Sequence, residues 1–158
     1  MATETATTDA VSIESGNWKA GVAGGLVGSA VFGLLMTYVI SAPLLEVVIP
    51  SMYALAPPAA PFAGWVIHMA HGAVLGVGFA ALVGLAPSLG GSVGRSIGAG
   101  AAYGIALWVA LAVVVMPIWL SAVGSPASPP LPNVSAMSAV GHLAYGVVLG
   151  GAYAGRAD

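Results

Sequence analysis

Long apolar stretches over residues 18–40, 62–86, 93–120 and 135–155 dominate the pattern of hydrophobic and polar positions. Each provides the roughly 20 mostly apolar residues that an α-helix needs to cross the hydrocarbon core of a bilayer. A further apolar stretch, 44–55, is too short to span, and we expect it to lie at the membrane interface or to dip back into it. The pattern therefore predicts an all-α integral membrane protein with four transmembrane helices.

Composition supports a membrane protein and excludes several other classes. Of the 158 residues, 59% are hydrophobic and 5% are charged, whereas a soluble domain carries about 25% charged residues. The chain has no cysteine, which excludes disulfides, thiolate nucleophiles and iron–sulfur clusters. Three basic residues cannot form a nucleic-acid footprint, so no nucleic-acid partner is expected. The expected partners are the lipid bilayer and further copies of the chain or a larger membrane complex.

The charged residues predict the orientation and the domain organisation. Residues 1–17 form an acidic segment, expected to be a disordered cytoplasmic tail, and residues 18–158 form the transmembrane domain. Lys19, Arg95 and Arg156 all fall at the end of the bundle shared by the N-terminus, the turn between the second and third helices, and the C-terminus. The positive-inside rule then predicts a multi-pass plasma-membrane protein with both termini in the cytoplasm.

Two similar sequences indicate an internal repeat. Residues 68–72 have the sequence HMAHG and residues 142–146 have the sequence HLAYG, and each is followed four residues later by another glycine. The predicted repeats cover residues 18–86 and 93–155. Because each repeat contains two helices, both have the same orientation in the membrane. We therefore expect two duplicated hairpins related by a pseudo-twofold axis along the membrane normal.

Glycines four residues apart recur along the predicted helices. This spacing favours close approach of helix backbones in a membrane, where lipid offers no hydrophobic driving force. A second interpretation is that Gly72 and Gly146 make room for a planar ligand beside the histidines. The pairs are Gly21/Gly25, Gly24/Gly28, Gly72/Gly76, Gly100/Gly104 and Gly146/Gly150.

All three histidines lie in the repeated element and in the predicted outer half of the membrane. His68 and His71 are three residues apart and share one helix face. His142 occupies the depth that corresponds to His68, and Tyr145 replaces His71 in the second repeat. We expect His68 and His142 to face each other near the pseudo-axis. Ionisable groups at membrane depth are costly, which makes them candidates for a functional site.

Three chemistries suit these residues, and a structural role competes with them. His68 and His142 could bind the iron of haem b as axial ligands. His68, His71 and His142, with Glu46 as a further ligand, could hold Cu or Zn. The histidines with Glu46 and Tyr145 could instead form a proton or ion relay. In the structural role, each neutral imidazole donates a hydrogen bond to a carbonyl of a neighbouring helix.

The sequence Gly64-Trp65-Val66-Ile67-His68, followed by Gly72 and Gly76, resembles a group of small uncharacterised four-helix membrane proteins common in haloarchaea. Some of these archaeal proteins carry a histidine-kinase label. The resemblance covers roughly residues 18–155 and implies the four-helix topology but no established activity.

Catalytic constellations such as GxSxG, HExxH or a phosphate-binding loop are missing from the sequence. We therefore expect a non-enzymatic membrane protein, an accessory subunit of a respiratory or other redox assembly with a candidate histidine haem or metal site. The alternative is a small oligomeric transporter or channel for ions, protons or metals that uses the same histidines. A third hypothesis gives the histidines a purely structural role.

Overall fold

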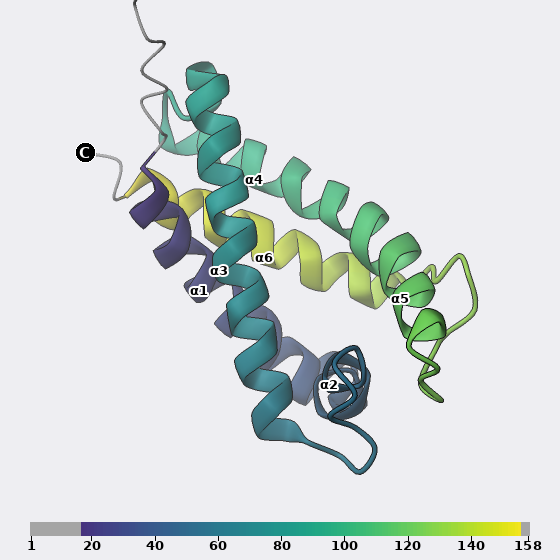
Figure 1. Ribbon diagram of the computed structural model, residues 1–158. Coiled ribbons are helices and arrows are strands. Elements are labelled where there is room, and N and C mark those ends of the chain that lie inside the picture. The colour runs from purple at the N-terminus through teal and green to yellow at the C-terminus, as the bar shows by residue number, and fades with distance from the viewer. Residues whose placement is uncertain (1–16, 156–158) are drawn as a thin grey trace, which may run out of the picture.

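The computed structural model describes residues 17–155, and within them the chain is helical with no strand. The helices form a bundle whose two hairpins diverge toward one end (Figure 1). The long helices begin and end close to the predicted boundaries. In chain order the elements are α1 (Trp18–Leu35), η1 (Met36–Ile40), η2 (Leu44–Val48), α2 (Ile49–Ser51), α3 (Pro61–Leu85), η3 (Pro87–Leu89), α4 (Val93–Leu107), η4 (Trp108–Val115), α5 (Met116–Ala122) and α6 (Ala136–Ala154).

The start of α1 is fixed by an N-cap. The Oδ1 atom of Asn17 accepts a hydrogen bond from the backbone N–H of Ala20 at 3.0 Å, which satisfies one of the free donors in the first turn. The tail expected over residues 1–17 otherwise lies outside the described residues, as does Arg156.

Three of the helices are long and apolar enough to cross a membrane: Trp18–Ile40, Pro61–Leu85 and Val93–Ala122. Three of the four expected transmembrane helices therefore meet this criterion. The remaining helix, α6, has 19 residues and falls outside this set. Its polar side chains, His142, Tyr145 and Tyr153, lower its hydropathy.

Each hairpin is held by backbone contact at glycines. In the first hairpin α1 packs on α3, and a Cβ atom added to Gly25 would overlap the carbonyl of Gly72. In the second hairpin α4 packs on α6, and a Cβ added to Gly100 would overlap the carbonyl of Gly146. Glycine is therefore required at these positions because any larger residue would push the two helix axes apart.

The two hairpins meet through α1 and α6. Here Gly24 faces Leu149 and Gly28 faces the ring of Tyr145. Packing of these side chains against glycine builds the core at the middle of the bundle. The helices therefore follow one another in the order α3, α1, α6 and α4.

The short apolar stretch after α1 is helical and packs beside the start of α3. Leu45 in η2 is buried, and its carbonyl lies so close to Gly64 that a Cβ there would overlap it. The backbone N–H of Ala60 donates a hydrogen bond to the carbonyl of Glu46 at 2.8 Å. This segment therefore covers the end of the first hairpin away from Lys19, which agrees with the prediction that it does not span.

The third long helix becomes π-helical before Pro117. Proline has no N–H, and the Met116 N–H bonds to the Leu111 carbonyl, so the carbonyls of Val113 and Ala112 lack the partners that a continuous α-helix would give them. Asn133, in the loop before α6, replaces both. Its Nδ2 donates to the Ala112 carbonyl at 3.3 Å and its backbone N–H donates to the Val113 carbonyl at 3.1 Å.

Candidate functional site

His68 joins the two helices of the first hairpin. Its Nε2–H donates a hydrogen bond to the carbonyl of Ser29 in α1 at 3.0 Å, and the residue is 8% exposed. The bond forms because Gly72, one turn further along α3, lets the two backbones approach closely. Since a carbonyl can only accept, Nε2 carries the proton and Nδ1 keeps the lone pair of the ring.

His142 makes its hydrogen bond within its own helix. Nδ1 donates to the carbonyl of Ser138, one turn earlier in α6, at 2.8 Å. The proton therefore lies on Nδ1, and Nε2 keeps the lone pair. His68 and His142 thus use opposite ring nitrogens, one between helices and one within a helix.

Phe32 of α1 contacts both of these imidazoles. Its ring centroid lies 5.4 Å from that of His68 and 4.8 Å from that of His142, with edge-on geometry in both cases. The ring fits because Gly141 has no side chain, and a Cβ there would overlap it. An aromatic ring therefore packs on both histidines that were expected to face each other directly.

The folded arrangement does not present a preassembled haem or three-histidine site. Haem ligation by two histidines requires both imidazoles to point at one iron from opposite sides of the porphyrin, whereas here both pack on Phe32. Gly72 and Gly146 face the backbones of α1 and α4 and leave no room for a planar ligand. Among residues 17–155, no three or more His, Asp and Glu residues are grouped as metal ligands.

His71 belongs to a separate group in the half of the bundle away from Lys19, which we call the outer half. Its Nε2 is hydrogen-bonded to the Tyr53 hydroxyl at 2.6 Å. The Tyr53 ring centroid lies 6.2 Å from the indole of Trp119 in α5, and the indole Nε1 donates to the carbonyl of Met52 at 2.9 Å. We call Met52, Tyr53, His71 and Trp119 the outer latch.

Tyr145 and Glu46, the two candidate relay residues, lie on different parts of the fold. The Tyr145 hydroxyl donates to the Gly72 carbonyl at 2.8 Å, in the buried interior. Glu46 is half-buried on η2. Within residues 17–155 no hydrogen bond joins these two side chains.

Several residues of the site were not singled out from the sequence. Ser29, Phe32, Tyr53 and Trp119 all contact a histidine or its partner. Ser29 had a detectable signal, because it continues the four-residue spacing of Gly21 and Gly25. Its hydroxyl is fully buried against Gly72 and has no hydrogen-bond partner.

Comparison of this chain with protein-family models, with curated proteins and with solved structures gives no match. The haloarchaeal resemblance therefore stays a prediction, and the functional argument rests on the geometry.

The two histidines differ in what their removal should do. We expect His68→Ala to lower the free energy of unfolding by about 1 kcal/mol more than His142→Ala, because only His68 bonds to another helix. Ser29→Ala should leave stability unchanged or raise it, since it removes an unpaired buried hydroxyl. Unfolding of the purified variants in detergent or bicelles checks this order. Equal losses for the two histidine variants would contradict it.

Proposed function

We propose that this chain is a non-enzymatic polytopic membrane protein that acts as an accessory subunit of a larger membrane assembly, of a redox type by virtue of its histidines. The observation that carries the proposal is the use of the interior polar side chains. His68, Tyr145, Tyr103 and Ser96 each donate a hydrogen bond to a backbone carbonyl of another helix. Such bonds stabilise helix association in lipid and leave no interior constellation for catalysis among the described residues.

We further propose that the bundle has four spanning helices built as two duplicated hairpins. The contacts at three successive levels support this. Gly21 meets Gly76, Gly25 meets Gly72, and Ser29 meets His68. In the second hairpin the corresponding contacts join Ser96 with Gly150, Gly100 with Gly146, and Gly104 with His142.

Larger features repeat in the same register. The π-helical segment η1 corresponds to the second half of η4, in the outer part of both hairpins. Phe79 corresponds to Tyr153, and their ring centroids lie 5.5 Å apart at an interplanar angle of 89°. Contact between equivalent residues is expected near a twofold axis. These features favour a pseudo-twofold axis along the bundle.

The proposed topology places α6 across the membrane with both termini in the cytoplasm. At 1.5 Å per residue α6 is roughly 28 Å long, close to the ~30 Å hydrocarbon core. Lys19 and Arg95 lie at the end of the bundle where α1 and α4 begin and α6 ends (Figure 1). The positive-inside rule then favours this end as the cytoplasmic side of the plasma membrane.

We propose that the side of α4 turned away from the rest of the bundle is the surface that binds a partner in the assembly. Gly94, Gly98, Ala102 and Ala106 are exposed and four residues apart. Nothing lies within 4 Å of a Cβ added to Gly94 or Gly98. The glycine pairs within the two hairpins are covered by neighbouring helices, whereas this stripe is open to a further helix, from a second copy or from another subunit.

Substitution on this stripe should weaken the assembly. We expect Gly98→Leu to shift the protein toward the monomer by about tenfold or more in dissociation constant, because the side chain keeps the helices apart. Val74→Leu, at an exposed position of α3, is the matched control. Sedimentation or single-molecule photobleaching in bilayers measures the change. Identical association of the parent and Gly98→Leu would contradict the use of this face.

The redox part of the proposal depends on His68 and His142. Nδ1 of His68 and Nε2 of His142 keep their lone pairs and could ligate a metal such as Cu or Zn once the Phe32 ring moves aside. Haem would in addition require the helices to separate at Gly72 and Gly146, where their backbones are in contact. We expect the membrane-extracted protein to contain a bound metal, and the double variant His68→Ala with His142→Ala to lose it. A metal-free sample from cells supplied with Cu and Zn would remove this part of the proposal.

A second candidate function is a small oligomeric transporter or channel for ions, protons or metals. The same two lone pairs favour it, because they lie in the apolar interior on one aromatic ring. The described residues form one packed core between the hairpins, so a pathway would need either movement of Phe32 or several copies of the chain.

A further inference from the structure

The outer part of the third long helix is poorly fixed to the bundle. Before Trp108 in the sequence, α4 is held to α6 by close contacts at Gly100 and Gly104. Beyond Trp108 the chain is π-helical over η4 and then continues as α5. Within residues 17–155 the extensive contacts of α5 are with η4 of the same helix, not with another long helix. We call Trp108–Ala122 the outer arm.

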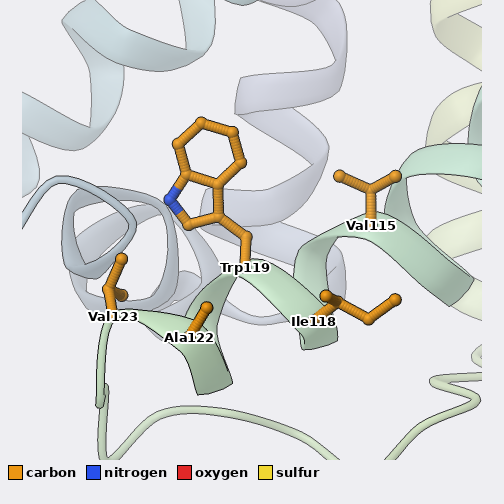
Figure 2. A pocket seen from close by; sticks show the side chains of 5 residues that line it. All are labelled: Val115, Ile118, Trp119, Ala122 and Val123. Carbon is orange, nitrogen blue, oxygen red and sulfur yellow. The ribbon is translucent and has the colours of Figure 1, made fainter.

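The arm carries an apolar side around Trp119, whose indole contacts the first hairpin. Figure 2 shows Val115, Ile118, Trp119, Ala122 and Val123 along this stretch of helix, with the Trp119 indole standing clear of the ribbon. These residues line an open cavity of about 280 Å³. This hollow lies on the surface of the arm, whereas Pro117 and Leu120 of the same stretch are buried.

The outer latch connects this arm to the first hairpin. Trp119 donates its indole N–H to the carbonyl of Met52, and the neighbouring Tyr53 is bonded to His71 of α3. Side-chain hydrogen bonds of α5 to the first hairpin are, among the described residues, limited to the one from Trp119. The latch therefore runs from α5 through the segment after α2 to α3.

We take η4 as the point where the arm bends. It is π-helical, and such stretches inside a helix occur frequently at functional sites. Just below it, Tyr103 donates to the Leu75 carbonyl at 2.9 Å and fixes α4 to α3. At the first residue of η4, the Nε1 donor of Trp108 is buried without a partner. An unpaired buried donor is costly, so the latched conformation is not fully satisfied at the hinge.

We propose that Trp108–Ala122 is a hinged arm and that the outer latch holds it against the first hairpin. Opening breaks the bond from Trp119 to the Met52 carbonyl and moves the indole away from Tyr53 and His71. This device goes beyond the proposed accessory role, because the open face of α4 would bind a partner whether or not the arm moves.

Spin-label distances can detect this movement. The arm is roughly 22 Å long at 1.5 Å per residue, so a rotation of about 15° moves its tip by about 6 Å. The chain has no cysteine, so labels can be attached to two introduced cysteines without background. Val66→Cys on α3 and Ile118→Cys on α5 are both at positions 52% exposed, and labels there report the distance between α3 and α5.

The test compares a latch variant with a matched control. Tyr53→Phe and Trp119→Phe together remove both hydrogen-bond donors and keep aromatic rings. We expect the distance between labels 66 and 118 to lengthen or broaden by about 5 Å or more in this variant, with each single substitution giving a smaller change. Tyr38→Phe, at a position 80% exposed, should leave the distribution unchanged.

A second label pair separates arm movement from general loosening. Leu34→Cys and Val66→Cys lie within the first hairpin and should give the same distance in the parent and in the latch variant. An unchanged 66–118 distance in the double variant would overturn the proposal. Broadening of both label pairs would overturn it as well, because the change would not be confined to the arm.

Discussion

Close contact between helix backbones at glycine is the interaction on which the rest of this protein depends. Lipid chains are as apolar as the helix surfaces, so burial of apolar area gives the helices little reason to associate. Van der Waals contact between backbones supplies the attraction instead. Gly25 with Gly72, and Gly100 with Gly146, bring the helices close enough that neighbouring polar side chains reach a carbonyl across the interface. Ser96, which donates to the Gly150 carbonyl at 2.8 Å, is one such side chain.

One exchange of residues explains why the two sides of the bundle differ. On one side, Gly28 lets α1 approach α6 directly, with the Tyr145 ring packed on it. In the proposed register of the two hairpins, Tyr103 of α4 takes the place of Gly28. Its side chain lies between α4 and α3, contacting Phe79 at 5.6 Å between ring centroids. The hairpins therefore close on the α1–α6 side and stay apart on the α3–α4 side, where the outer latch lies.

The sequence was sufficient to predict the long helices and the glycines at which they pack, because both depend on local patterns. Hydropathy located the long helices, and four-residue spacing identified Gly25, Gly72, Gly100 and Gly146. The rotation of each helix about its axis was harder to predict. Phe32 packs on both His68 and His142 because Gly141 leaves space for it, and no periodicity in a uniformly apolar helix indicates that fit. The partner of His71 could not be predicted either, since Tyr53 comes from a connection whose path depends on tertiary packing.

The most direct test of the account compares two adjacent glycines of α6. A Cβ at Gly150 would overlap the carbonyl of Ser96, whereas a Cβ at Gly151 would lie 3.7 Å from Ile97, an ordinary contact. The free energy of unfolding in bicelles should fall by about 1–3 kcal/mol for Gly150→Ala. For Gly151→Ala it should stay the same or rise by up to about 1 kcal/mol, because alanine favours the helix. Equal effects of the two substitutions would contradict the claim that backbone contact at glycine holds the helices together.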